Sequence, residues 1–258
     1  MANMDPAGPA RGEEGRSRPS WLVPVVIIVA ALLAIGAVYL TRSDDSEHAA
    51  QEQTSASDGD DNAAVEHPDS VAAPDLSSEE SRDPDDLVAE GPVDAPVVLV
   101  MFTDFQCPYC AQWSEETLPT MREYVDRGEL RIEWRDVNVY GDDSERAAKA
   151  VVAASMQDQL EAYHDTLFEG GEIRSSGELS EQALIDVATE LGLDTEQFEQ
   201  DMNSPEVQDI VDANAQQGID IGAMSTPAFI IGGTPTVGAQ PTEHFTQLVD
   251  EALAEARD

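Results

Sequence analysis

Residues 97–110 read VVLVMFTDFQCPYC, and this stretch decides which fold the sequence predicts. Its first six residues form an unbroken apolar run, rich in β-branched side chains, that follows the turn-forming prolines Pro92 and Pro96. Such a run predicts a strand that is buried on both faces. A helical pattern begins at Pro108, so we expect the strand to lead into a helix that carries both cysteines.

The chain after this strand predicts a parallel pair of strands. The helical pattern continues to about residue 126, where Gly128 predicts the C-cap, and Pro119 inside the pattern should kink the helix. Residues 130–137, LRIEWRDV, alternate apolar and charged side chains, which is typical of a half-buried strand. Strand, helix and strand in this order predict a right-handed crossover.

The remaining chain predicts a helical insertion followed by a hairpin and a last helix. The pattern from about residue 144 to 218 is helical, with Ser180 as the cap of one helix and two shorter segments separated near Pro205. Two short strands joined by a Gly-Gly turn follow at 228–237, and a helix is expected from about 242 to 256. The predicted architecture is α/β, in the order βαβ, helical insertion, ββα.

Charge divides the chain into parts. Residues 43–90 contain 16 acidic side chains against the single base Arg82 and are rich in Ser, Ala and Asp, so residues 41–90 are predicted to be a disordered acidic linker. The expected folded domain, residues 91–258, carries a formal charge of −26. Nucleic acid is excluded as a partner because phosphate binding needs a basic patch. The acidity is interpreted as a solvated surface, with a cationic partner as the alternative.

An apolar segment near the N-terminus predicts membrane attachment. Residues 21–40, WLVPVVIIVAALLAIGAVYL, carry no charge and are long enough for a helix that crosses the apolar core of a bilayer. Three arginines precede the segment, which places residues 1–20 in the cytoplasm and the domain outside, in a single-pass protein of the cell membrane. The alternative is a cleavable signal peptide. An anchor is favoured because the apolar stretch is long and no Ala-x-Ala site follows it.

The two cysteines, Cys107 and Cys110, predict redox chemistry. A single bridge across so short a loop restrains little of the unfolded chain, so a stapling role is not expected. A zinc site needs about four ligands, and none of the four histidines lies at a companion spacing, so no metal is expected. Idle thiols are also unexpected in an exported chain, because an oxidising compartment converts thiols to disulfides.

The position of Cys107 predicts its chemistry. At the start of a helix its sulfur lies near unpaired N–H groups and the positive end of the helix dipole, which stabilise a thiolate. A lowered pKa makes Cys107 a ready leaving group and favours the reduced form of the pair, so the disulfide is expected to act as an oxidant. Cys110, one turn further along, is expected to be shielded and to act as the resolving thiol.

A second motif, Ser225-Thr226-Pro227 followed by AFII, completes a resemblance. A strand leading into Cys-Pro-aromatic-Cys, a helical insertion, and Thr-Pro before the next strand resemble the DsbA-like branch of the thioredoxin superfamily, over about residues 93–256. The resemblance implies a thioredoxin-like fold, a redox disulfide between Cys107 and Cys110, no cofactor, and a cis bond before Pro227. The backbone of Thr226 is expected to pair with an extended substrate. The alternative interpretation of Thr226-Pro227 is a turn that opens a strand.

Three other residues are candidates for supporting roles. Pro108 and Tyr109 lie between the cysteines, and Tyr109 is expected to tune the thiolate and to pack against substrate. Asp104 is either a proton relay or, as favoured, a cap or solvated side chain. Many thioredoxin-like proteins have a buried acid six residues before the first cysteine, where this chain has Met101. The proton of Cys110 is therefore left to Asp104 or water.

Three aromatic positions near the motif, Phe105, Trp113 and His164, are expected to be structural rather than catalytic.

The resemblance implies an oxidase that donates the Cys107–Cys110 disulfide to exported proteins with cysteines and is reoxidised by a membrane quinone-linked thiol oxidase. Two alternatives stay open. One is a disulfide isomerase or reductase on the same fold, although the segment before the fold reads as an acidic linker rather than a dimerisation domain. The other is a tethered peptide-binding or chaperone module that does not turn over.

Overall fold

The computed structural model describes residues 74–257. The predicted cytoplasmic tail, membrane anchor and most of the acidic linker lie outside these residues. Within the described part of the chain, none of the helices combines the length and the apolar character that crossing a bilayer requires.

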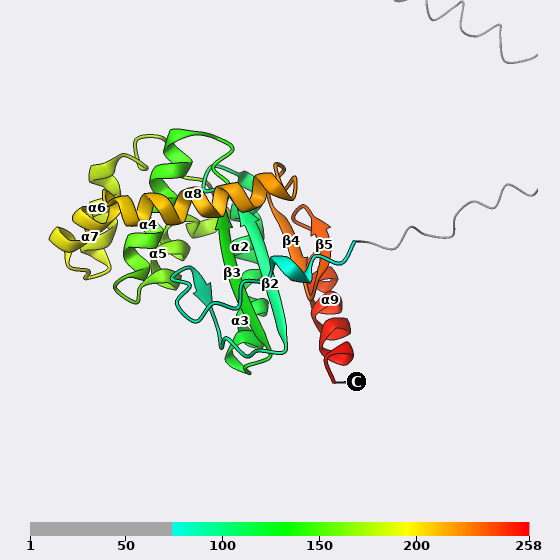
Figure 1. The fold of residues 1–258 in the computed structure, drawn as a ribbon. Helices are drawn as coiled ribbons and strands as arrows, with labels where there is room; N and C mark the ends of the chain where they lie inside the picture. The colour runs from blue at the N-terminus through cyan, green and yellow to red at the C-terminus, as the bar shows by residue number, and fades with distance from the viewer. Residues whose placement is uncertain (1–73, 258) are drawn as a thin grey trace, which may run out of the picture. The chain divides into compact units, whose positions relative to one another are not determined.

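A five-stranded mixed sheet forms the centre of the domain (Figure 1). Its strands are β1 (Ala89–Glu90), β2 (Val97–Thr103), β3 (Leu130–Asp136), β4 (Ala228–Ile231) and β5 (Thr234–Val237), in the order β1-β3-β2-β4-β5. Strands β2 and β3 are parallel, as predicted from the crossover, and the other three pairs are antiparallel. The hairpin of β4 and β5 turns at two glycines with positive φ, 52° and 77°, a backbone region that glycine enters without steric cost.

The helix after β2 is divided in two, close to the predicted kink. Helix α2 (Pro108–Glu116) ends at Thr117, and α3 (Leu118–Asp126) begins one residue before Pro119. Pro119 thus occupies the first turn of α3, where a missing N–H costs nothing because the first N–H groups of a helix have no partner within it. Gly128, with φ of 70°, ends this region as predicted.

Five helices form the predicted insertion between β3 and β4. Their bounds are α4 (Asp142–Ser155), α5 (Leu160–Leu167), α6 (Glu181–Glu190), α7 (Thr195–Met202) and α8 (Pro205–Asp220). Ser180 caps α6 as predicted, since its side chain accepts a hydrogen bond from the backbone of Ala183. The predicted split near Pro205 is confirmed, since α7 ends at Met202 and α8 begins at Pro205, but α8, with 16 residues, is not a short segment. Ser204 caps α8 and Pro205 starts it, so the proline begins a long helix.

The sheet separates two apolar cores. Alternate residues of β2, among them Leu99 and Met101, face a large core that α2, α3 and the closing helix α9 (Thr242–Glu255) share with the insertion. The intervening residues, including Val100 and Phe102, face a smaller core. All seven residues of β2 are buried, as a strand covered on both faces requires.

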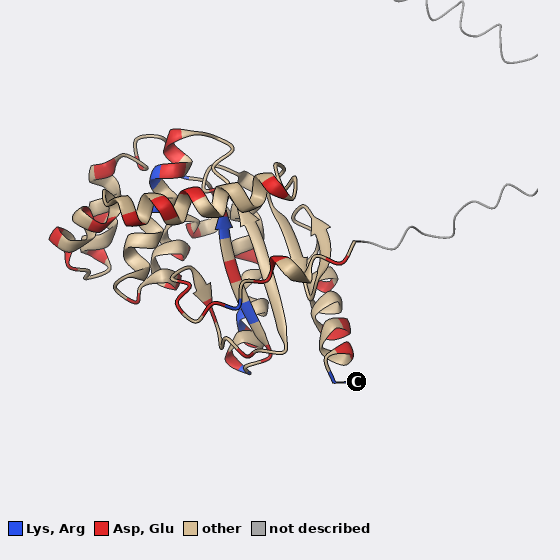
Figure 2. Ribbon diagram, viewed as in Figure 1, with Lys and Arg blue, Asp and Glu red and all other residues tan. Residues whose placement is uncertain are grey.

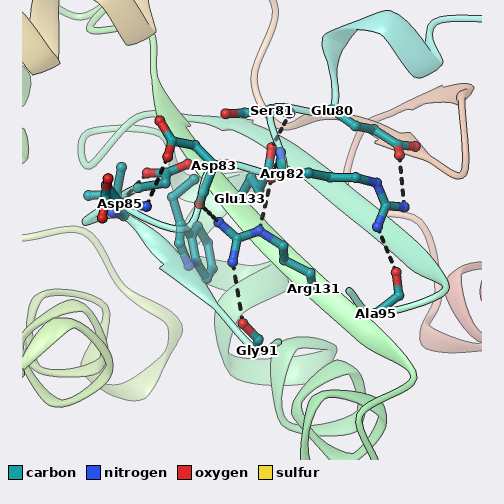
Figure 3. A network of polar contacts seen from close by, with 12 residues as sticks. Glu80, Ser81, Arg82, Asp83, Asp85, Gly91, Ala95, Arg131 and Glu133 are labelled. Atoms are coloured by element: carbon teal, nitrogen blue, oxygen red, sulfur yellow. Dashed lines mark hydrogen bonds and ion pairs between the residues drawn. The ribbon is translucent and has the colours of Figure 1, made fainter. Parts of the chain in front are cut away.

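The prediction that β3 is half-buried was wrong, because all seven of its residues are buried. The buried side chains of Arg131 and Glu133 lie beneath the segment that precedes β2 (Figure 3), and the buried Arg135 pairs with Asp86 of the same segment. Glu133 accepts hydrogen bonds from the backbone N–H groups of Ser81 and Arg82 at 2.9 and 2.8 Å. It also pairs with both arginines of β3, at 3.0 and 3.1 Å. An alternating pattern could not reveal this cover, because the covering segment comes from elsewhere in the chain.

The predicted linker boundary at residue 90 also needs correction. Residues 74–90 are packed on the domain: β1 pairs with β3, and the backbone N–H of Leu76 donates to Gly233 at 2.8 Å. Acidic side chains that suggested a disordered linker find basic partners here, such as Asp86 with Arg135 at 2.8 Å. Figure 2 shows how sparse Lys and Arg are against the many Asp and Glu residues. The few basic residues of β3 therefore serve to hold this segment.

We predict that Glu133→Ala lowers the free energy of unfolding by about 3–5 kcal/mol, because it leaves two buried guanidinium groups without their shared carboxylate. Glu129→Ala is the control, because its pairs with Arg127 and Arg257 are partly exposed and their loss should cost less than about 1 kcal/mol. Denaturant unfolding of both variants measures the difference. Equal losses would show that the Glu133 network does not hold the segment.

Candidate active site

The dithiol lies where β2 ends and α2 begins. Cys107 is the N-cap of α2 and Pro108 is its first residue, as predicted from the sequence. The carbonyl of Cys107 accepts from the backbone N–H groups of Cys110 and Ala111, at 3.0 and 3.2 Å. Both cysteines are free thiols and both are buried. The helix thus places Cys110 one turn inside the protein from Cys107.

The second predicted motif lies directly against Cys107. When Cys107 is protonated, its thiol donates to the backbone carbonyl of Thr226 at 3.3 Å. The Thr226–Pro227 bond is cis, as predicted. Antiparallel pairing of β4 with β2 sets Ala228 opposite Phe102, which brings the residues before β4 to the end of β2 that carries the dithiol.

The two thiols have opposite pKa shifts. The pKa of Cys107 is lowered to about 6, above all by a hydrogen bond from the Cys110 thiol. Burial opposes this shift, while Thr226 and the N–H groups of Cys110 and Tyr109 support it. The pKa of Cys110 is raised, first by burial and then by its contact with Cys107. Near neutral pH the pair therefore holds one thiolate, on Cys107, and one proton, on Cys110.

Asp104 connects the turn before Cys107 to the loop after β3. Its fully buried carboxylate accepts from the backbone N–H of Gln106 at 2.8 Å, from the Ser144 hydroxyl at 2.5 Å and from the backbone N–H of Tyr140 at 3.1 Å. This geometry fits a cap that fixes two loops. Because the carboxylate is buried, the interpretation of Asp104 as a solvated side chain is wrong.

A second buried carboxylate, Asp136, was not anticipated from the sequence. It ends β3 and is the register partner of Thr103 on β2. The alternation of the sequence could have indicated it. Leu130, Ile132 and Trp134 form the buried apolar face of β3, and Asp136 is the next residue on that face. A polar residue in the core-facing phase of a strand marks a position that deserves a functional test.

Exposed apolar side chains belong to three segments near the dithiol. Tyr109 is 63% exposed, Tyr140 is 56% exposed and Met224 is 53% exposed. The charge of the Cys107 thiolate is the largest cause that raises the pKa of Tyr140, so this ring lies close to the sulfur. Tyr140 was not anticipated, because it comes from a loop more than thirty residues away in sequence.

The aromatic residues expected to be structural are indeed in the core. Trp113 packs against Trp134, Phe229 and Phe245, with ring centroids 5.0 to 6.4 Å apart. Phe105 stacks on Phe168 at 5.0 Å and meets the buried ring of His164 at 5.8 Å.

A thioredoxin-like sheet with a thiolate-thiol pair at the start of the helix after β2, facing a cis-proline loop, defines a class: the thiol-disulfide oxidoreductases. A sequence model described as Thioredoxin matches residues 83–251. The chain belongs to this thioredoxin family, and it is a thiol-disulfide oxidoreductase.

Two relatives and one solved structure are similar to this chain. The probable disulfide bond formation protein D of Bacillus anthracis is 28% identical over 148 residues, which are 55% of this chain and 68% of that protein. The thiol:disulfide interchange protein DsbG of Pseudomonas aeruginosa is 35% identical over 78 residues, 30% of this chain and 28% of that one. The crystal structure of oxidised BdbD from Bacillus subtilis superposes with a TM-score of 0.59 at 20% identity, covering 65% of this chain and 92% of that chain.

We predict that the alkylation rate of Cys107 in the reduced protein rises with pH through a midpoint near 6, because only the thiolate reacts. Cys110→Ala should move this midpoint upward, toward the value of about 8.5 for a free thiol, since it removes the main hydrogen bond to the thiolate. Rates with a small alkylating reagent, measured from pH 4 to 10, test both statements. An unshifted midpoint in the unaltered protein would contradict them.

Proposed function

We propose that this chain is an extracytoplasmic disulfide oxidase, which donates a Cys107–Cys110 disulfide to exported proteins that contain pairs of cysteines. The observation that carries this proposal is the unequal pair: a stabilised thiolate on Cys107 beside a protonated, buried Cys110. Stabilising the reduced form makes the disulfide form a better oxidant.

The reaction takes two exchange steps. A client thiolate attacks the sulfur of Cys107, a client–Cys107 disulfide forms, and the Cys107–Cys110 bond breaks with its electron pair going to Cys110. A second client thiolate then attacks the client sulfur of this mixed disulfide, and Cys107 leaves as a thiolate. The client loses two electrons and the cysteine pair gains them.

The surface around Cys107 supports binding of an unfolded client. Tyr109, Tyr140 and Met224 offer exposed apolar contacts, and the backbone beside Pro227 offers hydrogen bonds to an extended chain. Because Cys107 itself is buried, its sulfur has to become accessible when a client thiolate approaches.

Direction and location complete the proposal. The Bacillus anthracis relative is a probable disulfide bond formation protein, which agrees with oxidation. The DsbG relative keeps disulfide interchange as the second candidate. Residues 21–40 are proposed to anchor the chain in the cell membrane with the domain outside, and a membrane quinone-linked thiol oxidase is proposed to restore the disulfide.

We predict that Cys110→Ala traps client proteins on Cys107, because the thiol that resolves a mixed disulfide is missing. The full chain with this substitution, expressed in a bacterium with an exported client, should give adducts on a non-reducing gel that disappear on reduction. The matched control is the double variant Cys107→Ala, Cys110→Ala, which should form none. Client binding without any adduct would favour the peptide-binding module instead.

A further inference from the structure

Asp136 is a buried carboxyl group that the exchange steps above do not use. It is 3% exposed, and its Oδ1 atom has no hydrogen-bond partner within residues 74–257. Thr103, its register partner on β2, is 1% exposed and its hydroxyl is also unpartnered among these residues. Two unsatisfied polar groups, side by side in an apolar core, destabilise a fold and so call for a functional reason.

Both side chains lie on the face of the sheet that α2 covers. On β2, Thr103 lies on the same face of the strand as Leu99 and Met101, which are in the large core. On β3, Asp136 lies on the same face as Ile132 and Trp134, which are in that core as well. Cys110 belongs to the same core. The Thr103 hydroxyl is close enough to Cys110 to lower the pKa of that thiol, although it makes no hydrogen bond of ordinary geometry. Strand pairing thus places Thr103 beside Asp136, on the face of the sheet that packs against the helix of Cys110.

Burial keeps the carboxyl of Asp136 protonated at neutral pH. The pKa of Asp136 is raised to about 8, first by burial and then by the charge of Asp104 just after β2, while Arg135 on β3 opposes the shift. From α4, Ser144 contacts Asp104, and from α5, the His164 ring lies 4.3 Å from that of Trp134. A group that changes charge near pH 8 is suited to exchanging protons with a thiol.

We propose that Asp136 is the proton donor and acceptor of Cys110, acting through the Thr103 hydroxyl. This inference rests on the proposed exchange reaction. When a client thiolate breaks the Cys107–Cys110 bond, Cys110 receives the electron pair and takes a proton from the Asp136 carboxyl, which becomes a carboxylate and is reprotonated from solvent. In the reverse step, Cys110 attacks a mixed disulfide on Cys107 and gives its proton to the Asp136 carboxylate.

Asp104 is the competing acid for this role. The backbone N–H of Asp104 is one of the groups that lower the pKa of Cys110, and the Asp104 side chain is as buried as that of Asp136. Both of its oxygens are already occupied by donors from Gln106, Ser144 and Tyr140, so accepting a proton would break the contacts that fix two loops. Asp136 has a free acceptor atom among the described residues and no such contacts to lose.

The test measures the reactions of the two thiols separately with dithiobis(nitrobenzoate). Each attack on this reagent's disulfide releases one coloured thiolate, whose absorbance is recorded. Attack by Cys107 of the reduced protein releases the first equivalent, and attack by Cys110 on the resulting mixed disulfide releases the second. In the unaltered protein, the second rate should rise with pH to a plateau above about 8. Asp136→Asn should slow the second release at pH 8 by about 10- to 100-fold and remove the plateau, and leave the first release unchanged.

Substitutions of Thr103 supply the second arm. Thr103→Val should slow the second release, whereas Thr103→Ser, which keeps the hydroxyl, should preserve it. An unchanged second release in Asp136→Asn would overturn the role of Asp136 while leaving the oxidase proposal intact, and so would equal slowing of both releases. A single release from the unaltered protein would overturn both proposals, because the pair would then not cycle.

Discussion

The rest of the site depends on the interaction between the two neighbouring thiols, which lowers the pKa of Cys107 and raises that of Cys110. The two sulfurs share one proton and one negative charge. Their surroundings determine which sulfur is the thiolate and which is the protonated thiol. Cys107 lies at the N-terminus of α2, where N–H groups favour charge, and Cys110 lies inside the core, where burial disfavours it. In the proposed reaction, this asymmetry makes Cys107 the leaving group and Cys110 the resolving thiol.

The fold supplies this asymmetry through strand pairing. Strand β2 ends beneath α2, β3 lies parallel on one side of it, and β4 lies antiparallel on the other. The ends of these three strands bring together the dithiol, the buried acids Asp104 and Asp136, and the cis-proline loop. Further from the site, the buried charges around Glu133 hold the segment that joins the domain to the preceding chain.

The sequence predicted local features well and non-local ones poorly. Cys107 and Cys110, at a strand-helix junction, and Pro227 before a short strand could be found because each signal lies within a few neighbouring residues. Asp136 and Tyr140 could not, because their proximity to the dithiol depends on how β3 and its following loop pack. The buried charges of β3 were missed for the same reason, since an alternating pattern does not show which face another segment covers.

The central claim is that the protein favours its reduced form and therefore oxidises clients. The reduction potential of the Cys107–Cys110 pair, measured by equilibration in glutathione buffers, tests it most directly. We predict a value well above the roughly −270 mV of thioredoxin, in the range of about −180 to −120 mV that disulfide-donating enzymes show. A value near or below about −270 mV would contradict the account and identify the protein as a reductase.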